Sequence, residues 1–373
     1  MSIINEINPL AMSGVYVIYG NAGGIYEKDG EYGTSHLMEH MVCHNYDDLR
    51  DTFQENGIRA NAYTTCDTVV FHITGLTSRV EPLAKEFVAR ITGGVSDHIT
   101  KEMFENEKKT VLQEYGDTFA DPVSCGMLNG IRKIFGGYAA IGRRRDIENF
   151  SFDDFRRVYD EKFRRPNLVV YVGPTGINFT GIECADRAGE ILCPPVYSEN
   201  RSIELEQNPV VDRTFITCFS KLVCTREDSM ALRIACRMLS SGLNSPLYQE
   251  IREKRGLSYF SIGDMERMGP AVIPMFCAAT DREKLAELIG VYDMVFGDLD
   301  RYLTEERFSL CLNFAKITRE ENHVLRYENY DDLVVKALGY ALDDDELDTL
   351  TLDRVKEVAN RYISLPQICK YSS

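Results

Sequence analysis

Hydrophobic residues fall into two kinds of segment along this chain. Short, almost continuous apolar runs are typical of buried strands, and they cover residues 13–20, 68–73, 167–172, 211–219, 271–279 and 367–371. Longer runs with helix start and stop residues predict helices over 49–56, 81–92, 100–115, 123–135, 151–163, 228–240, 247–254, 282–296, 304–323 and 351–363. Strands and helices therefore alternate along the whole chain.

One arrangement of elements occurs twice. A capped helix, a proline and a buried strand follow one another at residues 151–172, and the same order returns 200 residues later, at 351–371. Matching positions carry identical residues: Asp153 and Asp353, Val158 and Val358, Pro166 and Pro366, Tyr171 and Tyr371. A repeat at a fixed offset predicts two related halves. We expect one half over residues 1–190, the other over 205–373, and an irregular linker at about 190–205.

The segment from Gly33 to Met41 carries the strongest chemical signal. It contains H-x-x-E-H, formed by His36, Glu39 and His40. Positions i, i+3 and i+4 of a helix share one face, so the three side chains should point the same way. Two imidazoles one turn apart can bind one zinc ion, and the carboxylate beside them can act as the base for an attacking water. The order is the inverse of the commoner H-E-x-x-H. The alternative is a chance pair of histidines on a polar helix face.

A third zinc ligand is expected on another element, because a catalytic zinc ion keeps three protein ligands. The predicted helix at 100–115, which we expect to end at Gly116, contains Glu107 and Glu114. These two residues are seven positions apart and therefore share a face of the helix. The spacing does not choose between them, and most acidic residues on such a helix are simply solvated.

Together these motifs resemble a known family. H-x-x-E-H, followed roughly seventy residues later by a helical E-x6-E, is the signature of the zinc metallopeptidases that include pitrilysin, insulin-degrading enzyme and the mitochondrial processing peptidase. In this chain, 73 residues lie between His40 and Glu114. The resemblance implies that His36, His40 and Glu114 bind one Zn²⁺ per chain, that Glu39 is the catalytic base, and that Glu107 is a supporting carboxylate. It also implies an α+β fold of two related α/β-sandwich halves, each a mixed sheet covered by helices, which face each other as a clamshell around a chamber.

The second half carries another part of the resemblance. In the family this half supplies an Arg and a Tyr seven residues apart, which reach the substrate at the zinc, and Arg252 and Tyr259 match that spacing. Cationic and phenolic donors can hold a peptide carbonyl and stabilise the developing oxyanion. Without the resemblance, Arg252 is not distinguished from Arg255, and a salt-bridged surface Arg with a core Tyr is the alternative. The second half has no H-x-x-E-H, so the metal site belongs to the first half.

The β-rich segment around Asn61 resembles the family's edge strand, which binds substrate by adding it to the sheet. Asn61 and Ala62 are the implied substrate-binding residues, and such binding tolerates many sequences because it uses main-chain hydrogen bonds. That both are ordinary strand residues is equally open. Family members usually have one more strand before the first strand predicted here. The chain has hardly any room for it, so we expect the first sheet to lack that strand. We expect Thr34 or Ser35 to cap the H-x-x-E-H helix.

Composition narrows the class of partner. The 373 residues are 44% hydrophobic and 27% charged, which is ordinary for a soluble globular protein. A net charge of −16 argues against nucleic acid as a partner. No apolar run reaches the length of about 18 residues that a membrane span needs, and residues 1–12 carry no secretory or transit signal, so we expect no membrane association. The 11 cysteines lack C-x-x-C spacing, which predicts reduced thiols and a cytoplasmic protein.

The sequence therefore predicts a zinc-dependent endopeptidase that hydrolyses short or unfolded peptides inside an enclosed chamber. Short members of the family often dimerise, so we expect a homodimer, in which Arg252 and Tyr259 can face the zinc of the partner chain. Two alternatives stay open. One is a catalytically silent family member that binds peptides or acts as a scaffold subunit. The other is a metal-binding or regulatory protein, and in such a protein Glu39 is dispensable.

Overall fold

The computed structural model divides the chain into two compact units. The first comprises Met1–Asp117, Tyr138–Leu192 and Glu321–Gly339, and the second comprises Thr118–Gly137, Cys193–Glu320 and Tyr340–Ser373. Residues described by the structure are 3–20, 22–95, 98–135, 140–185, 202–205, 214–220, 222–269, 271–324, 344–364 and 366–372. Within these residues, no helix has the length and apolar character of a membrane span. Cys43, Cys224, Cys236, Cys277 and Cys311 are present as free thiols.

The first unit is built on a five-stranded mixed sheet. Its strands have the order β1-β5-β2-β4-β3, and they are β1 (Ile3–Ile7), β2 (Met12–Tyr19), β3 (Arg59–Thr64), β4 (Val69–Leu76) and β5 (Leu168–Gly173). β1 and β5 pair in parallel, and the other neighbours are antiparallel. The helices are η1 (Gly24–Tyr26), α1 (Thr34–Cys43), η2 (His44–Leu49), α2 (Arg50–Glu55), α3 (Thr77–Thr92), most of α4 (Lys101–Ala120), α6 (Arg144–Asn149), α7 (Phe152–Val158) and the π-helical η3 (Tyr159–Phe163).

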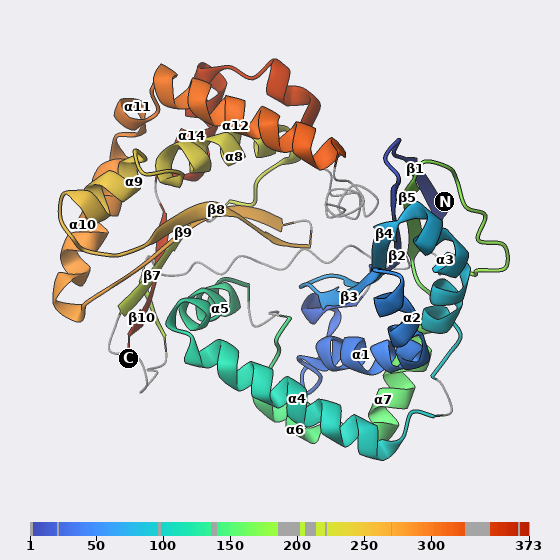
Figure 1. Ribbon diagram of the computed structural model, residues 1–373. Coiled ribbons are helices and arrows are strands. Elements are labelled where there is room, and N and C mark those ends of the chain that lie inside the picture. Colours follow the sequence, from blue (N-terminus) through green and yellow to red (C-terminus); the bar gives the residue numbers. More distant parts are fainter. Residues whose placement is uncertain are drawn as a thin grey trace. The chain divides into compact units, whose positions relative to one another are not determined.

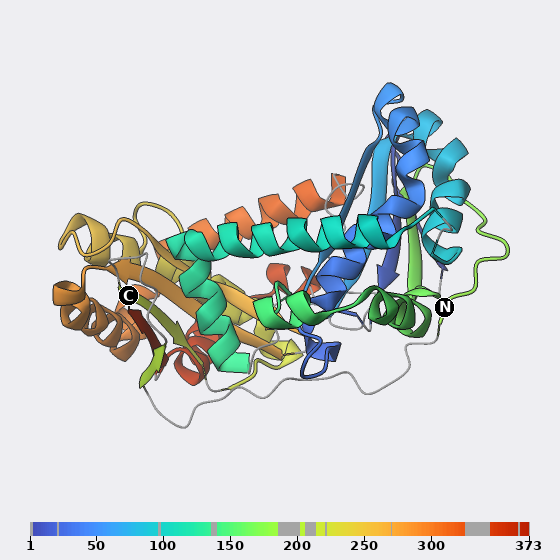
Figure 2. The same ribbon diagram turned by 90° about the horizontal axis from the view of Figure 1, so that it is seen from below.

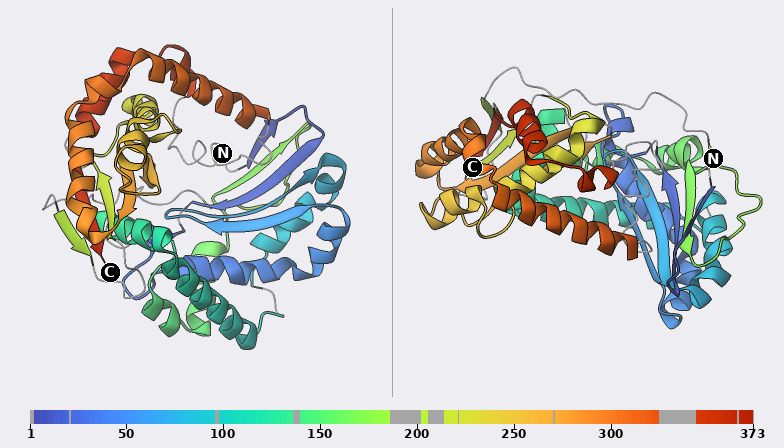
Figure 3. Two further views of the ribbon diagram at one scale, coloured as in Figure 1. Left: turned by 60° about the vertical axis from the view of Figure 1, so that its left-hand side comes forward. Right: turned by 90° about the horizontal axis from the view of Figure 1, so that it is seen from above.

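The core of this unit lies between the sheet and its helices. Alternate residues of β2, Val15, Val17 and Tyr19, face the helix layer, where they meet Leu37 of α1 and Phe87 of α3 in one buried cluster. Figures 1 and 3 show α1 and α3 along one face of the sheet. Burying each large apolar side chain stabilises the fold by about 1.5–3 kcal/mol. This packing fixes α1, and with it the H-x-x-E-H motif, against the strands.

The predicted absence of a strand at the start of the first sheet is wrong. β1 occupies Ile3–Ile7 and pairs with β5, from Ile3 opposite Val169 to Ile7 opposite Gly173. Five residues are enough because a parallel edge strand needs only one neighbour, and the hydrophobic core holds Ile3 in place. The short N-terminal segment therefore completes the sheet.

The long helix α4 does not end where the sequence predicts. It continues through Gly116 to Ala120, and Figure 2 shows it as one continuous helix. A glycine inside a helix costs only about 1 kcal/mol relative to alanine, so it does not by itself end a helix. The residues that follow, Asp121 and Pro122, begin the next helix instead.

The second unit repeats this architecture. Its sheet has the order β6-β10-β7-β9-β8, with β6 (Ser202–Leu205), β7 (Thr214–Phe219), β8 (Ser261–Met268), β9 (Ala271–Thr280) and β10 (Gln367–Ser372). The helices are α5 (Pro122–Phe135), α8 (Arg226–Ser240), α9 (Pro246–Tyr248), the π-helical η4 (Gln249–Glu253), η5 (Arg282–Lys284), α10 (Leu285–Gly297), α11 (Leu299–Tyr302), most of α12 (Glu305–Val324), η6 (Asp344–Asp348) and α14 (Leu352–Tyr362). α8 and α14 pack together beside the sheet (Figure 1).

The two sheets have equivalent topologies. In each, the first strand pairs in parallel with the last, the last pairs antiparallel with the second, and the second pairs antiparallel with the fourth. The repeated helix–proline–strand unit forms α7, η3 and β5 in one half and α14 and β10 in the other. The α+β fold of two related halves is thereby confirmed. The boundary predicted at about 190–205 stays a prediction, and residues 190–201 lie outside the described residues.

One helix from the first part of the sequence belongs to the second unit. α5 packs on β7 and β10, where Cys125 meets Phe215 in a small buried cluster. The approach is close: a Cβ atom on Gly126 would lie 2.3 Å from the ring of Phe215, and one on Gly130 would lie 2.9 Å from Oγ1 of Thr217. Glycine at these two positions lets the helix lie directly on the strand.

Candidate metal centre

The helix α1 begins in a way that the sequence pattern does not predict. Neither Thr34 nor Ser35 is its N-cap; that position is Gly33, which has φ of 98° and makes no side-chain capping bond. The buried carboxylate of Glu27 caps the helix instead. It accepts hydrogen bonds from the main-chain N–H of Gly33 at 2.7 Å and of Ser35 at 2.6 Å. A carboxylate at a helix N-terminus satisfies free N–H groups and opposes the positive end of the helix dipole. Glu27 thus fixes the turn that precedes His36.

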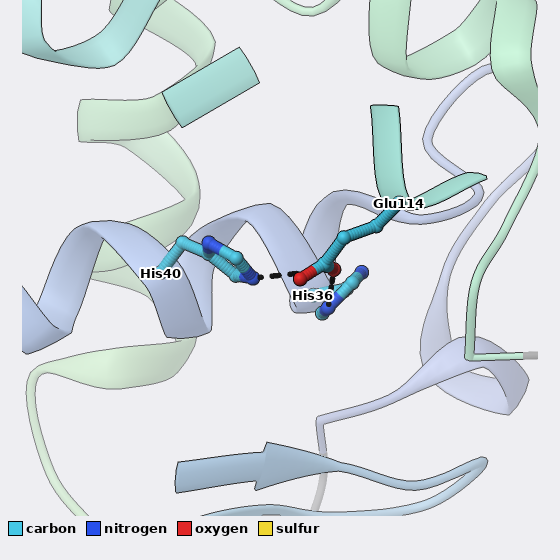
Figure 4. Close-up of side chains that lie close together, drawn as sticks. All are labelled: His36, His40 and Glu114. Carbon is cyan, nitrogen blue, oxygen red and sulfur yellow. Dashed lines mark ion pairs between the residues drawn. The ribbon is translucent and has the colours of Figure 1, made fainter. Parts of the chain in front are cut away.

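The structure brings His36, His40 and Glu114 together. Nε2 of His36 lies 3.3 Å from Oε2 of Glu114, and Nε2 of His40 lies 3.7 Å from the same oxygen. Figure 4 shows both rings directed at this carboxylate, which reaches them from α4. One ligand atom from each residue lies within 4.8 Å of the other two, and this is the one metal-type cluster found among the described residues.

The donor set fits a zinc ion. Zinc binds imidazole nitrogen and carboxylate oxygen at about 2.0–2.2 Å, so tetrahedral ligands lie about 3.4 Å apart. The two nitrogen–oxygen distances of 3.3 and 3.7 Å bracket that value. Burial, and secondarily the charge of His40, lower the pKa of His36 to about 4. At neutral pH the His36 ring is therefore neutral and has a lone pair to offer a metal.

Glu39 lies beside this cluster and points toward the outer strand of the sheet. It is 8% exposed, and its Oε2 accepts a 2.7 Å hydrogen bond from the hydroxyl of Thr64, the last residue of β3. Burial raises the pKa of Glu39, while the bond from Thr64 opposes that shift. A buried carboxylate held by one hydroxyl is suited to exchanging protons with a reactant.

Glu107 lies on α4, about two helical turns before Glu114, and contacts the other side of the His40 ring. Its Oε2 is 3.1 Å from Nδ1 of His40, and its Oε1 is 3.2 Å from Nε2 of His44. The geometry distinguishes the two glutamates. Glu114 faces Nε2 of both His36 and His40, whereas Glu107 faces Nδ1 of His40. His44 is not among the predicted site residues, although its spacing continues the i, i+4 series of His36 and His40. Glu27 and Thr64 are not among them either, because their contacts follow no local sequence pattern.

Asn61 and Ala62 lie on β3 at an edge of the first sheet. Asn61 is opposite His72 of β4 and Ala62 is opposite Phe71, and in the described part of the chain β3 has no strand on its other side. Asn61 is exposed, whereas Ala62 packs partly against the core. The outer edge of β3 thus presents main-chain groups that an extended peptide can pair with.

Arg252 and Tyr259 belong to the second unit, and they contact each other. The guanidinium of Arg252 lies 4.5 Å from the ring centroid of Tyr259 and 5.1 Å from that of Tyr248. Tyr259 is 74% exposed, so its hydroxyl is not used in the core. The guanidinium and the ring form a cation–π pair, and Nε of Arg252 also lies 3.8 Å from Glu253. Their role toward a substrate stays a prediction.

Comparison with known families identifies the class of this protein. Residues 3–126 match the family described as insulinase (peptidase family M16), and residues 191–313 match the peptidase M16 inactive domain. The two matches together cover more than half of the 373 residues. The chain belongs to peptidase family M16. Its H-x-x-E-H motif lies within the first match, and the second match contains no such motif.

Individual relatives agree with this assignment. An uncharacterized zinc protease of Streptomyces coelicolor is 25% identical over 285 residues, which are 69% of this chain and 61% of that protein. The chain therefore spans less than two thirds of that relative's length. Among solved structures, a protease from Helicobacter pylori superimposes with a TM-score of 0.79 at 16% identity over 100% of this chain and 97% of its own. A chain of complex III2 from Candida albicans does so with a TM-score of 0.79 at 13% identity, over 99% and 92%.

Proposed function

We propose that this protein is a zinc-dependent endopeptidase that hydrolyses short or unfolded peptides. The observation that carries the proposal is the convergence of His36, His40 and Glu114 within 4.8 Å, with Glu39 on the same helix. His36, His40 and Glu114 hold one Zn²⁺, which when bound polarises the scissile carbonyl and makes the attacking water more acidic. Membership of a family whose relatives are named zinc proteases supports this reading.

The protein's own residues supply the proton transfers. Glu39 takes a proton from the attacking water and passes it to the nitrogen of the leaving amine, so one carboxylate serves as base and then as acid. The hydroxyl of Thr64 holds that carboxylate in place at 2.7 Å. Glu107 accepts a hydrogen bond from Nδ1 of His40, which orients the ring so that Nε2 faces the metal.

Substrate binding uses the outer edge of β3. An extended peptide adds as a further strand beside Asn61 and Ala62, and main-chain hydrogen bonds hold it without strict sequence preference. Arg252 and Tyr259 donate to the scissile carbonyl and stabilise the negative charge that develops on its oxygen. In this proposal the two halves enclose a chamber, which restricts substrates to short or unfolded chains. The protein acts as a homodimer, and the Arg–Tyr pair serves the zinc of the partner chain.

A catalytically silent, peptide-binding or scaffold role is the second candidate. The similarity to a chain of complex III2, and the description of the second family match as an inactive domain, support it. The presence of Glu39 beside the complete His36, His40 and Glu114 set favours the peptidase, because a binding or storage site needs no base at that position.

Cleavage of a mixed peptide pool, analysed by mass spectrometry, tests the proposal. Zinc-loaded protein is compared with a chelator-treated sample and with Glu39→Gln, and zinc content is measured for each. We expect cleavage by the zinc-loaded protein only, with about one zinc per chain retained in Glu39→Gln. Zinc bound without any cleavage would favour the silent role, and absence of zinc would refute the site. Equal cleavage by Glu39→Gln would refute Glu39 as the base.

A further inference from the structure

His44 extends the histidine series of α1 by one more turn. His36, His40 and His44 are spaced four residues apart, and His44 stands where α1 passes into η2. Its side chain is 16% exposed, so it is as protected from solvent as His36. It is too far along the helix to join the Nε2 atoms that face Glu114.

The contacts of His44 form a continuous chain that ends at His40. Nε2 of His44 lies 3.2 Å from Oε1 of Glu107, and the other carboxylate oxygen of Glu107 lies 3.1 Å from Nδ1 of His40. On its other side, Nδ1 of His44 lies 2.6 Å from Asp47. Asp47 is in turn held by Arg50 at 2.7 Å. Glu107 thus bridges two imidazoles, one of which belongs to the metal cluster.

The hydrogen-bonding capacity of these groups shows which group donates and which accepts in this series of contacts. An ionised carboxylate only accepts, so Nδ1 of His40 donates to Glu107, which leaves Nε2 of His40 with the lone pair that a metal needs. His44 donates to the second oxygen of the same carboxylate. A glutamate has a long side chain with several rotatable bonds, and one contact does not fix it. Two imidazoles on consecutive helical turns fix both of its oxygens.

We propose that His44 is a positioning residue of the metal centre. It holds Glu107 against Nδ1 of His40, and through Glu107 it sets the orientation of the His40 ring and its strength as a zinc ligand. Partners of this kind, which contact a ligand rather than the metal, typically change metal affinity by about 10–100-fold when they are removed. The inference rests on the proposed zinc site but not on peptidase activity, because zinc binding alone reports it.

Two substitutions of His44 separate the contact with Glu107 from the contact with Asp47. The amide nitrogen of Gln reaches the position of the histidine Nε2, whereas that of Asn reaches the position of Nδ1. His44→Gln therefore keeps a donor for Glu107, and His44→Asn keeps one for Asp47 only. Both variants carry a polar, uncharged side chain of similar size, so they differ little from each other in burial and charge.

The experiment measures zinc affinity of the zinc-free protein by competition with a chromogenic chelator. We expect His44→Asn to bind zinc at least about tenfold more weakly than the wild type, and His44→Gln to lie within about threefold of it. His98→Gln is the matched control, because His98 contacts the main-chain oxygen of His44, which substitutions of the His44 side chain leave in place. Thermal unfolding of each zinc-free variant verifies that it is folded.

A double-substitution test separates the chain of contacts from a general structural effect. If His44 acts through Glu107, then His44→Asn should cause no further loss of zinc affinity in a Glu107→Gln background. Wild-type affinity in His44→Asn, or an undiminished loss in the Glu107→Gln background, would overturn the proposal and leave the zinc site standing. Failure of the wild type itself to bind zinc would instead refute the proposed function.

Discussion

Glu39 accepts a 2.7 Å hydrogen bond from Thr64, and this bond joins the H-x-x-E-H helix to the outer strand of the first sheet. Thr64 is the last residue of β3, the strand that carries Asn61 and Ala62. A peptide that adds to β3 would therefore run along the same strand that holds the base. In the proposed function the strand would position both reactants, since it would align the peptide and restrain the carboxylate.

The hydroxyl of Thr64 should matter for catalysis but not for zinc binding. Thr64→Val keeps the shape of the side chain and removes the hydrogen bond to Glu39. We expect kcat/KM for a cleaved peptide to fall about tenfold, the equivalent of one hydrogen bond to a charged group, with zinc content unchanged. Thr64→Ser retains a hydroxyl and should keep most of the activity. Full activity in Thr64→Val would show that the bond does not position the base.

Glu27 should stabilise the helix that carries the metal ligands. Glu27→Gln replaces an oxygen that accepts from Gly33 or Ser35 with an amide group that cannot accept. We expect the free energy of unfolding to fall by about 1–2 kcal/mol, measured by urea denaturation of the zinc-free protein. Glu31→Gln is the control, because Glu31 pairs with the partly exposed Arg157 and such pairs contribute at most about 1 kcal/mol. Equal effects of both substitutions would contradict a capping role for Glu27.

The sequence predicts those parts of the site that depend on spacing within one helix. His36, Glu39 and His40 share a face because of helical periodicity alone, and the structure places them on α1 as expected. Spacing on α4 left Glu107 and Glu114 equivalent, because their roles depend on which ring nitrogen each one faces across two helices. Only the tertiary arrangement shows that Glu107 meets Nδ1 of His40 and that Glu114 meets its Nε2.

The errors and omissions have related physical causes. β1 was not expected because a strand of Ile3–Ile7 is recognisable only by its partner β5, which lies more than 160 residues later. Glu27 and Thr64 could not be found because their contacts with α1 come from a loop and a strand. Gly116 was over-interpreted, since the weak helix propensity of one glycine is outweighed by the residues around it. Long-range packing decided the cases of β1, Glu27 and Thr64.

The packing of α5 on β7 should be intolerant of a single added methyl group. Gly126→Ala places a Cβ atom 2.3 Å from the Phe215 ring, so the helix or the ring must shift. We expect a loss of about 2 kcal/mol in the free energy of unfolding. Gly116→Ala is the matched control on α4, since its Cβ atom would meet nothing within 4 Å. That control should be stabilising by about 0.5–1 kcal/mol, so the two substitutions should have opposite signs.

The buried carboxylate of Asp228 should make the second unit sensitive to acid. Its oxygens accept hydrogen bonds from Tyr362 at 2.8 Å and from Arg361 at 2.7 Å, and Arg354 contacts it as well. Burial alone would raise the pKa of Asp228, but the bond from Tyr362 and the two guanidinium charges hold it below its ordinary value of 3.8. A carboxylate with a lowered pKa stabilises the fold above its unfolded pKa, and that stability is lost as pH falls through the folded value.

Asp228→Asn should remove this contribution. At neutral pH we expect the free energy of unfolding of the variant to be about 2 kcal/mol lower than that of the wild type. The difference should shrink as pH falls below about 4, because only the wild type has the Asp228 carboxylate whose contribution to stability is lost there. Chemical denaturation at a series of pH values measures both quantities. A difference that stays constant from neutral to acidic pH would mean that charge on Asp228 does not contribute.

Mixing two inactive variants should reveal which chain supplies Tyr259. His40→Ala removes a zinc ligand, and Tyr259→Phe removes the phenolic donor, which should lower kcat about 100-fold. If Arg252 and Tyr259 serve the zinc of the partner chain, a mixed dimer contains one site in which both His40 and Tyr259 are intact. Random exchange of equal amounts then restores about a quarter of wild-type activity.

The control for this experiment pairs two variants from the same half. In dimers of His40→Ala with Glu39→Gln every site lacks a ligand or the base, so no activity should return whichever chain supplies Tyr259. Light scattering establishes that the mixed proteins are dimers. Dimers of His40→Ala with Tyr259→Phe that stay inactive would mean that each chain uses its own Arg252 and Tyr259, because then every site in the mixed dimer lacks one of the two residues. A monomeric wild type with full activity would exclude the exchange altogether.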